Sequence, residues 1–216
     1  MHLTKPIPVL PPADAYTLWA PTYADEAHNP LMAAEQTIVE RLLGHVTARR
    51  ALDLGTGSGR YLRVLETSCT AVGVDLSAEM LRQCRPGSAI ARADARCLPF
   101  RRATFDLVNA SLMAGDIADL GAWLLEIARV LTLGGHLVYS DFHPLWSERG
   151  WQRTFRGTDG VLRAVAFVPH TIDQHLSALD AAGFHVSAIR EPRLKVAGRD
   201  RPVVAVFHAV KEGPAR

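Results

Sequence analysis

The stretch Ala51-Leu-Asp-Leu-Gly-Thr-Gly-Ser-Gly59, followed by Ala71-Val-Gly-Val-Asp75, decides the fold of this 216-residue chain. A short apolar strand runs into three alternating glycines, and a second short strand ends in a carboxylate. Gly55 and Asp75 are separated by about twenty residues, the spacing at which a second-strand acid binds a nucleoside ribose. Glycine permits positive φ and lets a ligand approach the backbone without a Cβ in the way. The pattern predicts a polar ligand with an adenosine-like ribose.

Strand-like and helix-like segments alternate from residue 50 onward. Strands are expected at 50–55, 70–75, 88–93, 104–110 and 134–142, and helices near 58–67, 77–84 and 119–131. Apolar runs such as Phe105-Asp-Leu-Val are typical of strands buried on both faces, as in a parallel sheet. Alternation at this pitch indicates an α/β fold with an open, doubly wound sheet.

The two ends of the chain depart from this rhythm. Residues 1–12 contain four prolines and are expected to be an irregular leader, and a helix ending at Gly44 precedes the first strand. Two short strands are expected within 152–168, around the hairpin-type turn Gly157-Thr-Asp-Gly160. A helix capped by Thr171 and stopped by Gly183 follows, and then two β-rich segments near 185–194 and 202–210. We expect one domain over residues 1–216.

Composition narrows the classes of partner. The formal net charge is only +2 and no run of Lys or Arg exceeds two residues, so the basic stripe of a nucleic-acid binder is missing. Cys69, Cys84 and Cys97 show no metal-ligand spacing and favour a reducing compartment. The first residues lack an apolar signal region, and no apolar run is long enough to cross a bilayer. We therefore expect a cytoplasmic protein with no metal, nucleic acid or membrane partner.

These motifs resemble those of class I S-adenosylmethionine-dependent methyltransferases over roughly residues 14–142. Asp53-Leu-Gly-Thr-Gly-Ser-Gly59 matches the family's first motif, which has an acid two residues before the first glycine. Nicotinamide-binding folds favour G-x-G-x-x-G without that acid. The chain is most similar to the small-molecule type 11 group, which includes ubiquinone-biosynthesis and malonyl-acyl-carrier methyltransferases. The resemblance implies a Rossmann-like sheet, mostly parallel with an antiparallel C-terminal strand.

The resemblance divides the domain into five parts. They are the leader (1–12), an N-terminal helical lid (13–45), a cofactor-binding core (46–142), a hairpin insertion over the substrate site (143–170), and a closing helix with a strand pair (171–216). Aromatic residues of the insertion are expected to cover the acceptor pocket: Trp146, Trp151, Phe155 and Phe167. Its basic residues leave aromatic, acidic and carrier-linked acceptors open: Arg149, Arg153 and Arg156.

The resemblance also implies which residues bind S-adenosylmethionine and its product S-adenosylhomocysteine. Asp53 would lie near the methionine amino group, and Gly55, Thr56 and Gly57 would line the cofactor. Asp75 would accept hydrogen bonds from both ribose hydroxyls, because a carboxylate can bind two neighbouring donors. A cap for the helix starting near residue 77 is the simpler alternative for this acid.

The adenine and methionine ends of the cofactor are assigned in the same way. Leu76 would pack on the adenine face, Asp94 would accept the N6 amine, and a backbone N–H at Ala95 would meet the ring. An acid in a loop at a strand end is commonly only a turn residue. Backbone around Ala110 would contact the methionine portion. The following Ala-Ser-Leu differs from the Pro-Pro-Tyr of amine-modifying relatives and argues against methylation of a base or glutamine amine.

An aromatic segment near the N-terminus is typical of small-molecule members of this family. Tyr16, Trp19 and Tyr23 have helical spacing, so they form either a core-packing stripe or a lid whose hydroxyls touch the methionine carboxylate, with Tyr23 as the better candidate.

A catalytic base is needed only for some acceptors, because carboxylates need none whereas hydroxyls and carbon acids usually do. His143 is the candidate base, at the end of the fifth strand, although a structural role is the simpler alternative. His28 and Asp116 are its rivals.

The sequence thus predicts transfer of a methyl group to an O, C or N atom of a small molecule by in-line displacement. A non-catalytic adenosylmethionine-binding module is the alternative. A nicotinamide-dependent oxidoreductase is disfavoured by the absence of both the six-residue glycine fingerprint and a Tyr-x-x-x-Lys motif.

Overall fold

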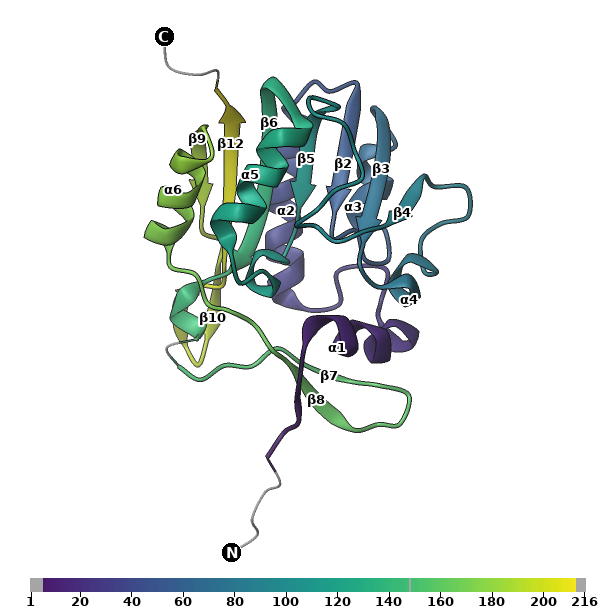
Figure 1. Ribbon diagram of the computed structural model, residues 1–216. Helices are drawn as coiled ribbons and strands as arrows, with labels where there is room; N and C mark the ends of the chain where they lie inside the picture. Colours follow the sequence, from purple (N-terminus) through teal and green to yellow (C-terminus); the bar gives the residue numbers. More distant parts are fainter. Residues whose placement is uncertain (1–5, 148, 213–216) are drawn as a thin grey trace, which may run out of the picture.

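A seven-stranded sheet forms the centre of the molecule (Figure 1), as seen in a computed structural model that describes residues 6–147 and 149–212. The strand order is β4-β3-β2-β5-β6-β12-β9. The strands are β2 (Arg50–Leu54), β3 (Thr70–Asp75), β4 (Ile90–Arg92), β5 (Phe105–Ala110), β6 (Leu131–Phe142), β9 (Phe184–Arg190) and β12 (Val204–Lys211). The pairs from β4 to β6 are parallel, whereas β12 is antiparallel to both β6 and β9. The predicted fold class, mostly parallel with an antiparallel C-terminal strand, is confirmed.

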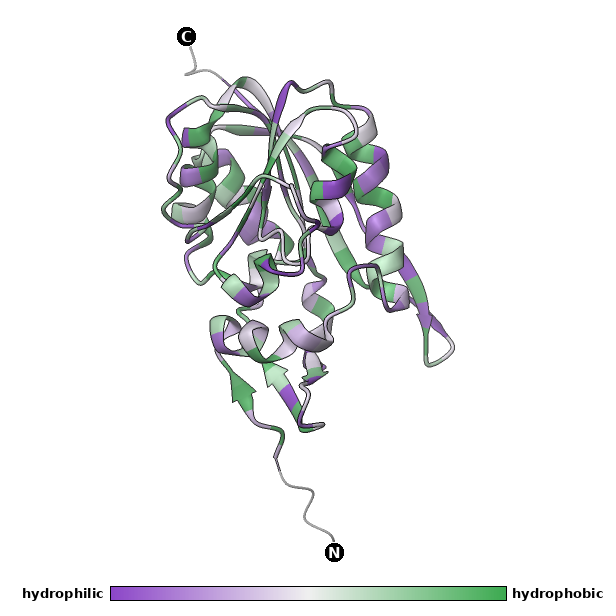
Figure 2. Cartoon of the chain, turned by 90° about the vertical axis from the view of Figure 1, so that its right-hand side faces the viewer, coloured by the Kyte–Doolittle hydropathy of each residue, from purple (hydrophilic) through white to green (hydrophobic). Residues whose placement is uncertain are grey.

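Helices cover both faces of the sheet (Figure 1). They are α2 (Pro30–Gly44), α3 (Arg60–Leu65), α4 (Ala78–Leu81), α5 (Leu120–Val130) and α6 (Ile172–Ala181). Leu107 packs in the cluster with α2 and α3, while its neighbour Val108 packs in the cluster with α5 and α6. Successive strand residues point to opposite faces, so a strand between two helical layers must be apolar throughout. Figure 2 shows hydrophilic and hydrophobic residues interleaved along the helices, as expected when one side of each faces solvent.

Local sequence signals set several helix ends. The Ser77 hydroxyl accepts a hydrogen bond from the Met80 amide at the start of α4. Thr171 and Gln174 form a reciprocal capping box at the start of α6, and Gly183 follows that helix with φ of 78°. The predicted caps at Thr171 and Gly183 are confirmed.

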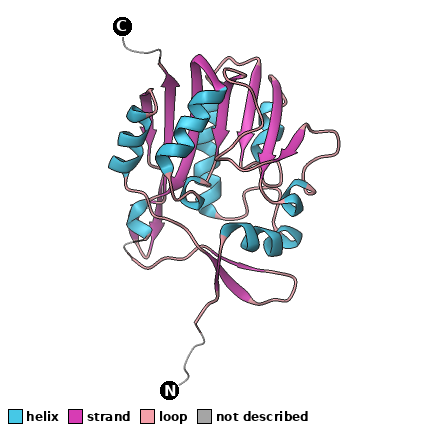
Figure 3. Ribbon diagram, viewed as in Figure 1, coloured by secondary structure: helices cyan, strands magenta, loops and turns pink. Residues whose placement is uncertain are grey.

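A second, small sheet lies below the central one (Figure 3). It has the order β1-β8-β7, with β1 (Val9–Leu10) parallel to β8 (Leu162–Val165) and β7 (Thr154–Arg156) antiparallel to it. Helix α1 (Pro12–Trp19) and the 3-10 turn η1 (Ala20–Thr22) pack on this sheet with their own buried cluster. Residues 9–22 and 154–165 together are called the cap here.

The prediction of an irregular leader over residues 1–12 is wrong in part. Residues 1–5 lie outside the described residues, but Val9–Leu10 form β1 and α1 begins at Pro12. The carbonyl oxygens of Pro8 and Leu10 accept hydrogen bonds from the Ala164 and Ala166 amides. Proline lacks only the donor, so a proline carbonyl can still serve a strand edge.

The hairpin β10 (Arg193–Val196) to β11 (Arg199–Pro202) was not predicted as a separate unit. Its turn residues, Ala197 and Gly198, both have positive φ, as a two-residue hairpin of type I′ requires. The remaining 3-10 turns are η2 (Ala114–Asp116) and η3 (Pro144–Trp146). Among the described residues, no helix has both the length and the apolar character needed to span a membrane.

Candidate cofactor and acceptor site

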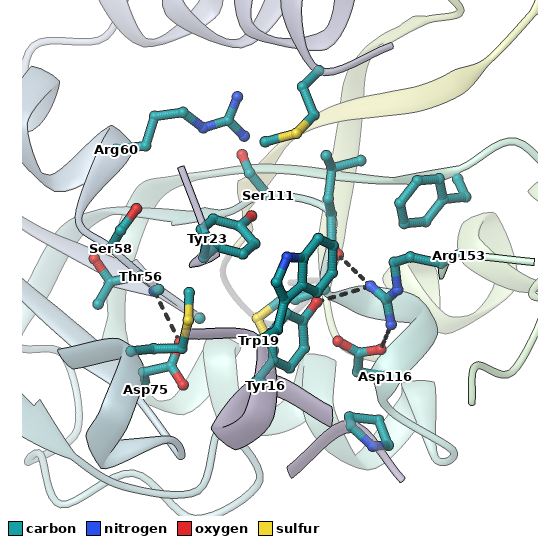
Figure 4. Close-up of a pocket in the computed structure, with 18 of the residues that line it drawn as sticks. Tyr16, Trp19, Tyr23, Thr56, Ser58, Arg60, Asp75, Ser111, Asp116 and Arg153 are labelled. Carbon is teal, nitrogen blue, oxygen red and sulfur yellow. Dashed lines mark hydrogen bonds and ion pairs between the residues drawn. The ribbon is translucent and has the colours of Figure 1, made fainter. Parts of the chain in front are cut away.

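A cavity of about 980 Å³ lies at the carboxyl ends of β2, β3 and β5, between the central sheet and the cap. Figure 4 shows side chains of α1, the glycine loop and the segment before β7 converging on it. Ligand pockets commonly measure about 300–1,000 Å³. The cavity therefore has room for a nucleoside cofactor and a second small molecule.

The glycine loop forms one wall of the cavity. Gly55 and Gly57 have φ of 68° and 56°, a region that favours glycine. A Cβ on Gly55 would lie 2.6 Å from the Met113 sulfur, and one on Gly57 would lie 3.1 Å from the Met80 methyl carbon. The loop thus presents bare backbone to the cavity, with Thr56 also in its wall.

Asp53 is a buried carboxylate at the end of β2. Its Oδ2 accepts a hydrogen bond from the Thr56 hydroxyl at 2.6 Å, and its Oδ1 accepts one from the Asn109 amide at 2.8 Å. Asn109 is its register partner on β5, so the pairing of parallel strands brings the two side chains together. Burial raises the pKa of Asp53 to about 6, against the effect of both hydrogen bonds. A cation placed beside it would stabilise the ionised form.

Asp75 closes β3 beside the same loop. Its oxygens accept hydrogen bonds from the Gly57 amide at 2.9 Å and the Ser77 amide at 2.8 Å. Burial raises its pKa, although both hydrogen bonds oppose this. Ser77 itself caps α4, so the alternative role of Asp75 as the helix cap does not apply. Leu76, next to it, is 44% exposed and lines the cavity, where it offers an apolar face to a ligand.

Asp94 and Ala95 also line the cavity, after β4. The Asp94 carboxylate is held by the Arg96 side chain, with Nε to Oδ1 at 2.9 Å and Nη2 to Oδ2 at 2.6 Å. This guanidinium lowers the pKa of Asp94. An adenine amine would therefore share the carboxylate with Arg96.

Two predicted site residues do not line the cavity. Ala110 is fully buried, and its neighbour Ser111 lines the wall in its place. His143 is also buried, and its Nε2 lies 2.8 Å from Glu191 Oε1 while its Nδ1 accepts a hydrogen bond from the Leu145 amide. Nδ1 thus holds the backbone at η3, and Nε2 holds the Glu191 side chain. The assignment of His143 as catalytic base is corrected to a structural role.

The N-terminal aromatic residues are both packing and lining residues. Trp19 stacks on Phe155 with ring centroids 5.0 Å apart, and it meets Tyr23 edge-on at the same distance. Tyr16, Trp19 and Tyr23 line the cavity together with His28. The two interpretations of this segment are therefore compatible, because Trp19 both packs within the cap and lines the cavity.

Arg60, which the motif did not single out, reaches the cavity from the start of α3. Its Nη2 lies 3.3 Å from Oε2 of Glu35, a fully buried acid on α2. The same carboxylate accepts hydrogen bonds from Tyr61 at 2.5 Å and Ser140 at 2.7 Å. Arg60 directly follows the last glycine of the loop, which was the available sequence signal.

Asp116 and Arg153 form a second polar centre, at the side of the cavity away from the glycine loop (Figure 4). Arg153 Nη2 donates to Asp116 Oδ1, and Nη1 donates to the Tyr16 hydroxyl at 3.0 Å. Burial raises the pKa values of Asp116 and Tyr16, whereas Arg153 lowers both. Within residues 6–147 and 149–212, no group of three or more potential metal ligands is present.

Comparison with known proteins finds similarity to methyltransferases. Residues 52–139 match the family described as methyltransferase domain. The chain is 29% identical over 148 residues to a fatty-acid O-methyltransferase of Mycolicibacterium smegmatis, covering 63% of this chain and 54% of the relative. It is 34% identical over 108 residues to a malonyl-[acyl-carrier protein] O-methyltransferase of Legionella pneumophila, covering 46% and 38%. The chain thus spans about half the length, or less, of these curated relatives.

A solved structure shares the fold. The complex described as DhpI–SAM–HEP superposes with a TM-score of 0.71 at 18% identity, covering 92% of this chain and 94% of the other. At this identity the likeness concerns the fold alone.

Proposed function

We propose that this chain, whose residues 52–139 match the methyltransferase-domain family, transfers a methyl group from S-adenosylmethionine to a small-molecule acceptor. The observation that carries the proposal is the meeting of a bare glycine loop with Asp53 and Asp75 in one cavity large enough for two ligands. A nicotinamide-dependent oxidoreductase finds no support in this loop, because its glycines lack the G-x-G-x-x-G spacing.

The residues in the wall fit the cofactor. Because Gly55 and Gly57 have no side chain, the cofactor can approach the backbone of the glycine loop closely. An ammonium group beside Asp53 would favour the ionised form of that buried acid. Asp75 would bind the ribose hydroxyls and Leu76 would cover the adenine. Arg60 is a cation for the methionine carboxylate, with Tyr23 nearby in the same wall. When bound, S-adenosylmethionine supplies a methyl group on a cationic sulfur that leaves as a neutral thioether.

The protein's own contribution is alignment and exclusion of water. The cap closes the cavity with Tyr16 and Trp19. Trp19 packs against the buried cluster of the cap, and Tyr16 stacks on Trp19. Orienting two reactants in a closed site replaces a bimolecular encounter with an effectively unimolecular step. The remaining volume favours an enzyme over a binding module without an acceptor, since the cofactor would fill only part of the cavity.

The test is cofactor-induced stabilisation. We expect S-adenosylhomocysteine, but not a nicotinamide dinucleotide, to raise the melting temperature of the wild-type chain, since a ligand of the native state stabilises it. Asp75→Asn should weaken the affinity for S-adenosylhomocysteine by about 10- to 100-fold, because hydrogen bonds from the ligand to a charged acceptor are lost. Asp180→Asn, at an exposed acid on α6, is the matched control and should bind as wild type does. A shift with the dinucleotide alone would contradict the proposal.

A further inference from the structure

The ion pair between Asp116 and Arg153 has no part in the cofactor assignments above. Its side chains are 11% and 8% exposed, and both line the cavity. Asp116 ends η2 after β5, and Arg153 immediately precedes β7 of the cap. Two charges are taken out of water here, which is costly and calls for an explanation beyond packing.

The surroundings of the pair are aromatic and apolar. The Arg153 guanidinium carbon lies 5.5 Å from the centre of the Tyr16 ring and 5.4 Å from that of Phe142. Arg153 Nε is buried and has no hydrogen-bond partner within the described part of the chain. Trp151 and Leu112 complete this wall of the cavity. The Asp116–Arg153 ion pair, with an unsatisfied N–H donor at Arg153 Nε, therefore lies in a part of the cavity whose other side chains suit an apolar molecule.

Charge decides which polar group this centre can accept. Asp116 and Arg153 neutralise each other, so an acceptor carboxylate would bring a third, uncompensated charge next to Asp116. Asp75 is also close enough to interact with Asp116 electrostatically. A neutral hydroxyl meets neither penalty, because it can donate to Asp116 and accept from the guanidinium.

We propose that Asp116 is the general base for a neutral, apolar acceptor that bears a hydroxyl group, of the phenol or enol class, and that Arg153 orients it. This inference rests on the proposed function. Arg153 holds Oδ1 of Asp116, and a carboxylate can accept further hydrogen bonds, so it can receive the acceptor's hydroxyl as well. The groups that face Asp116 are Arg153, Tyr16 and Asp141.

The step balances without another reactant. The acceptor oxygen loses its proton to Asp116 and forms its new bond to the methyl carbon, while the electron pair of the broken carbon–sulfur bond stays with sulfur. Asp116 then returns the proton to solvent. Burial raises the pKa of Asp116, which makes its carboxylate a stronger base than an exposed one.

Binding of two matched naphthalenes tests the substrate class. The protein is saturated with S-adenosylhomocysteine, and 2-naphthol or 2-naphthoate is titrated at neutral pH, where the first is neutral and the second an anion. Quenching of the fluorescence of Trp19, Trp146 and Trp151, which line the cavity, reports binding. We expect 2-naphthol to bind at least about tenfold more tightly. Asp116→Asn should reverse the preference, because it leaves Arg153 as an unpaired cation.

Turnover tests the role of Asp116. With S-adenosylmethionine, the wild-type chain is expected to methylate 2-naphthol, and Asp116→Asn should lower kcat by about 10²- to 10⁴-fold, the usual value of a general base. Affinity for S-adenosylhomocysteine should be unchanged in Asp116→Asn, as it should in the exposed control Asp180→Asn.

The outcomes separate the two proposals. Failure of wild-type protein to bind S-adenosylhomocysteine would overturn the proposed function itself. Equal or tighter binding of 2-naphthoate, absence of 2-naphthol turnover, or unchanged turnover in Asp116→Asn would overturn only the present inference.

Discussion

Gly55 leaves no room for a side chain at the turn between β2 and α3. We expect Gly55→Ala to weaken S-adenosylhomocysteine binding by more than about tenfold, because the added Cβ would lie 2.6 Å from the Met113 sulfur and displace the cofactor wall. The positive φ of 68° adds a backbone strain of about 1–2 kcal/mol. Affinity and melting temperature are measured together.

Gly134→Ala is the matched control for this substitution. Gly134 has φ of 71°, but a Cβ there would meet nothing within 4 Å. It should lose stability through the same strain and keep its cofactor affinity. Equal affinity in the two variants would show that the Gly55 contact does not shape the cofactor wall.

Residues whose role depends on local sequence were predictable, and residues that depend on distant contacts were not. Asp53 and Asp75 stand at strand ends beside the glycine loop, so their convergence follows from the parallel sheet. His143 was chosen because it follows β6, but the strand's alternation turns Phe142 to the cavity and His143 to Glu191. No spacing rule joins Asp116 to the residue that pairs with it.

At the scale of elements, sequence patterns identified the central strands and the β7–β8 hairpin of the cap, but not β1. β2 and β5 are buried along most of their length and are largely apolar, which is a strong signal in sequence. β1 has two residues, and Val9 pairs with Ala164 on a strand from the far end of the chain. A strand of two residues is too short to show an alternation of apolar and polar residues, and its formation depends on tertiary contacts alone. The leader prediction is wrong at Val9–Leu10 for this reason.

The cap should respond to mutation as a separate unit. Phe155 is 4% exposed, stacks on Trp19, and belongs to a buried cluster distinct from the two clusters beside the central sheet. We expect Phe155→Ala to remove amide-exchange protection from β8 and α1 while β2 and β5 keep theirs, because the cavity it creates lies wholly within the cap. Hydrogen exchange read by mass spectrometry is the measurement.

The control lies in the same hairpin. Val161→Ala changes a residue that is 44% exposed at the β7–β8 turn, and it should leave exchange in the cap as in wild type. Loss of protection that spreads to β2 and β5 would show that the cap and the central sheet unfold together.

At the scale of the whole molecule, the arrangement that builds the site also buries carboxylates, and their ionisation lowers the stability of the fold. Parallel strands bring Asp53 and Asp75, which lie at strand ends, to one edge of the sheet, where both line the cavity. Burial raises the pKa values of Asp53, Asp75 and Asp116 alike. These carboxylates are available to bind ligands, but their ionisation in buried positions lowers the stability of the fold.

This cost predicts that the stability of the fold depends on pH, and Asp53 contributes to that dependence. Its pKa is about 6 in the folded chain and 3.8 in a free side chain, so the native state binds the proton more tightly than the unfolded state. Stability therefore falls as pH rises from about 4 to about 6, by up to about 3 kcal/mol for a displacement of this size.

Asp53→Asn should remove that part of the pH dependence. The amide keeps the shape of the side chain and can still accept from Asn109 and donate to Thr56, so the fold is retained. We expect urea unfolding at pH 4 and pH 7 to show a wild-type loss of stability that exceeds the variant's by about 2 kcal/mol, because the unfolded side chain is already partly ionised at pH 4. Asp180→Asn, an exposed site, should follow the wild-type profile. Parallel profiles for wild type and Asp53→Asn would mean that Asp53 ionises at an ordinary pH despite its burial.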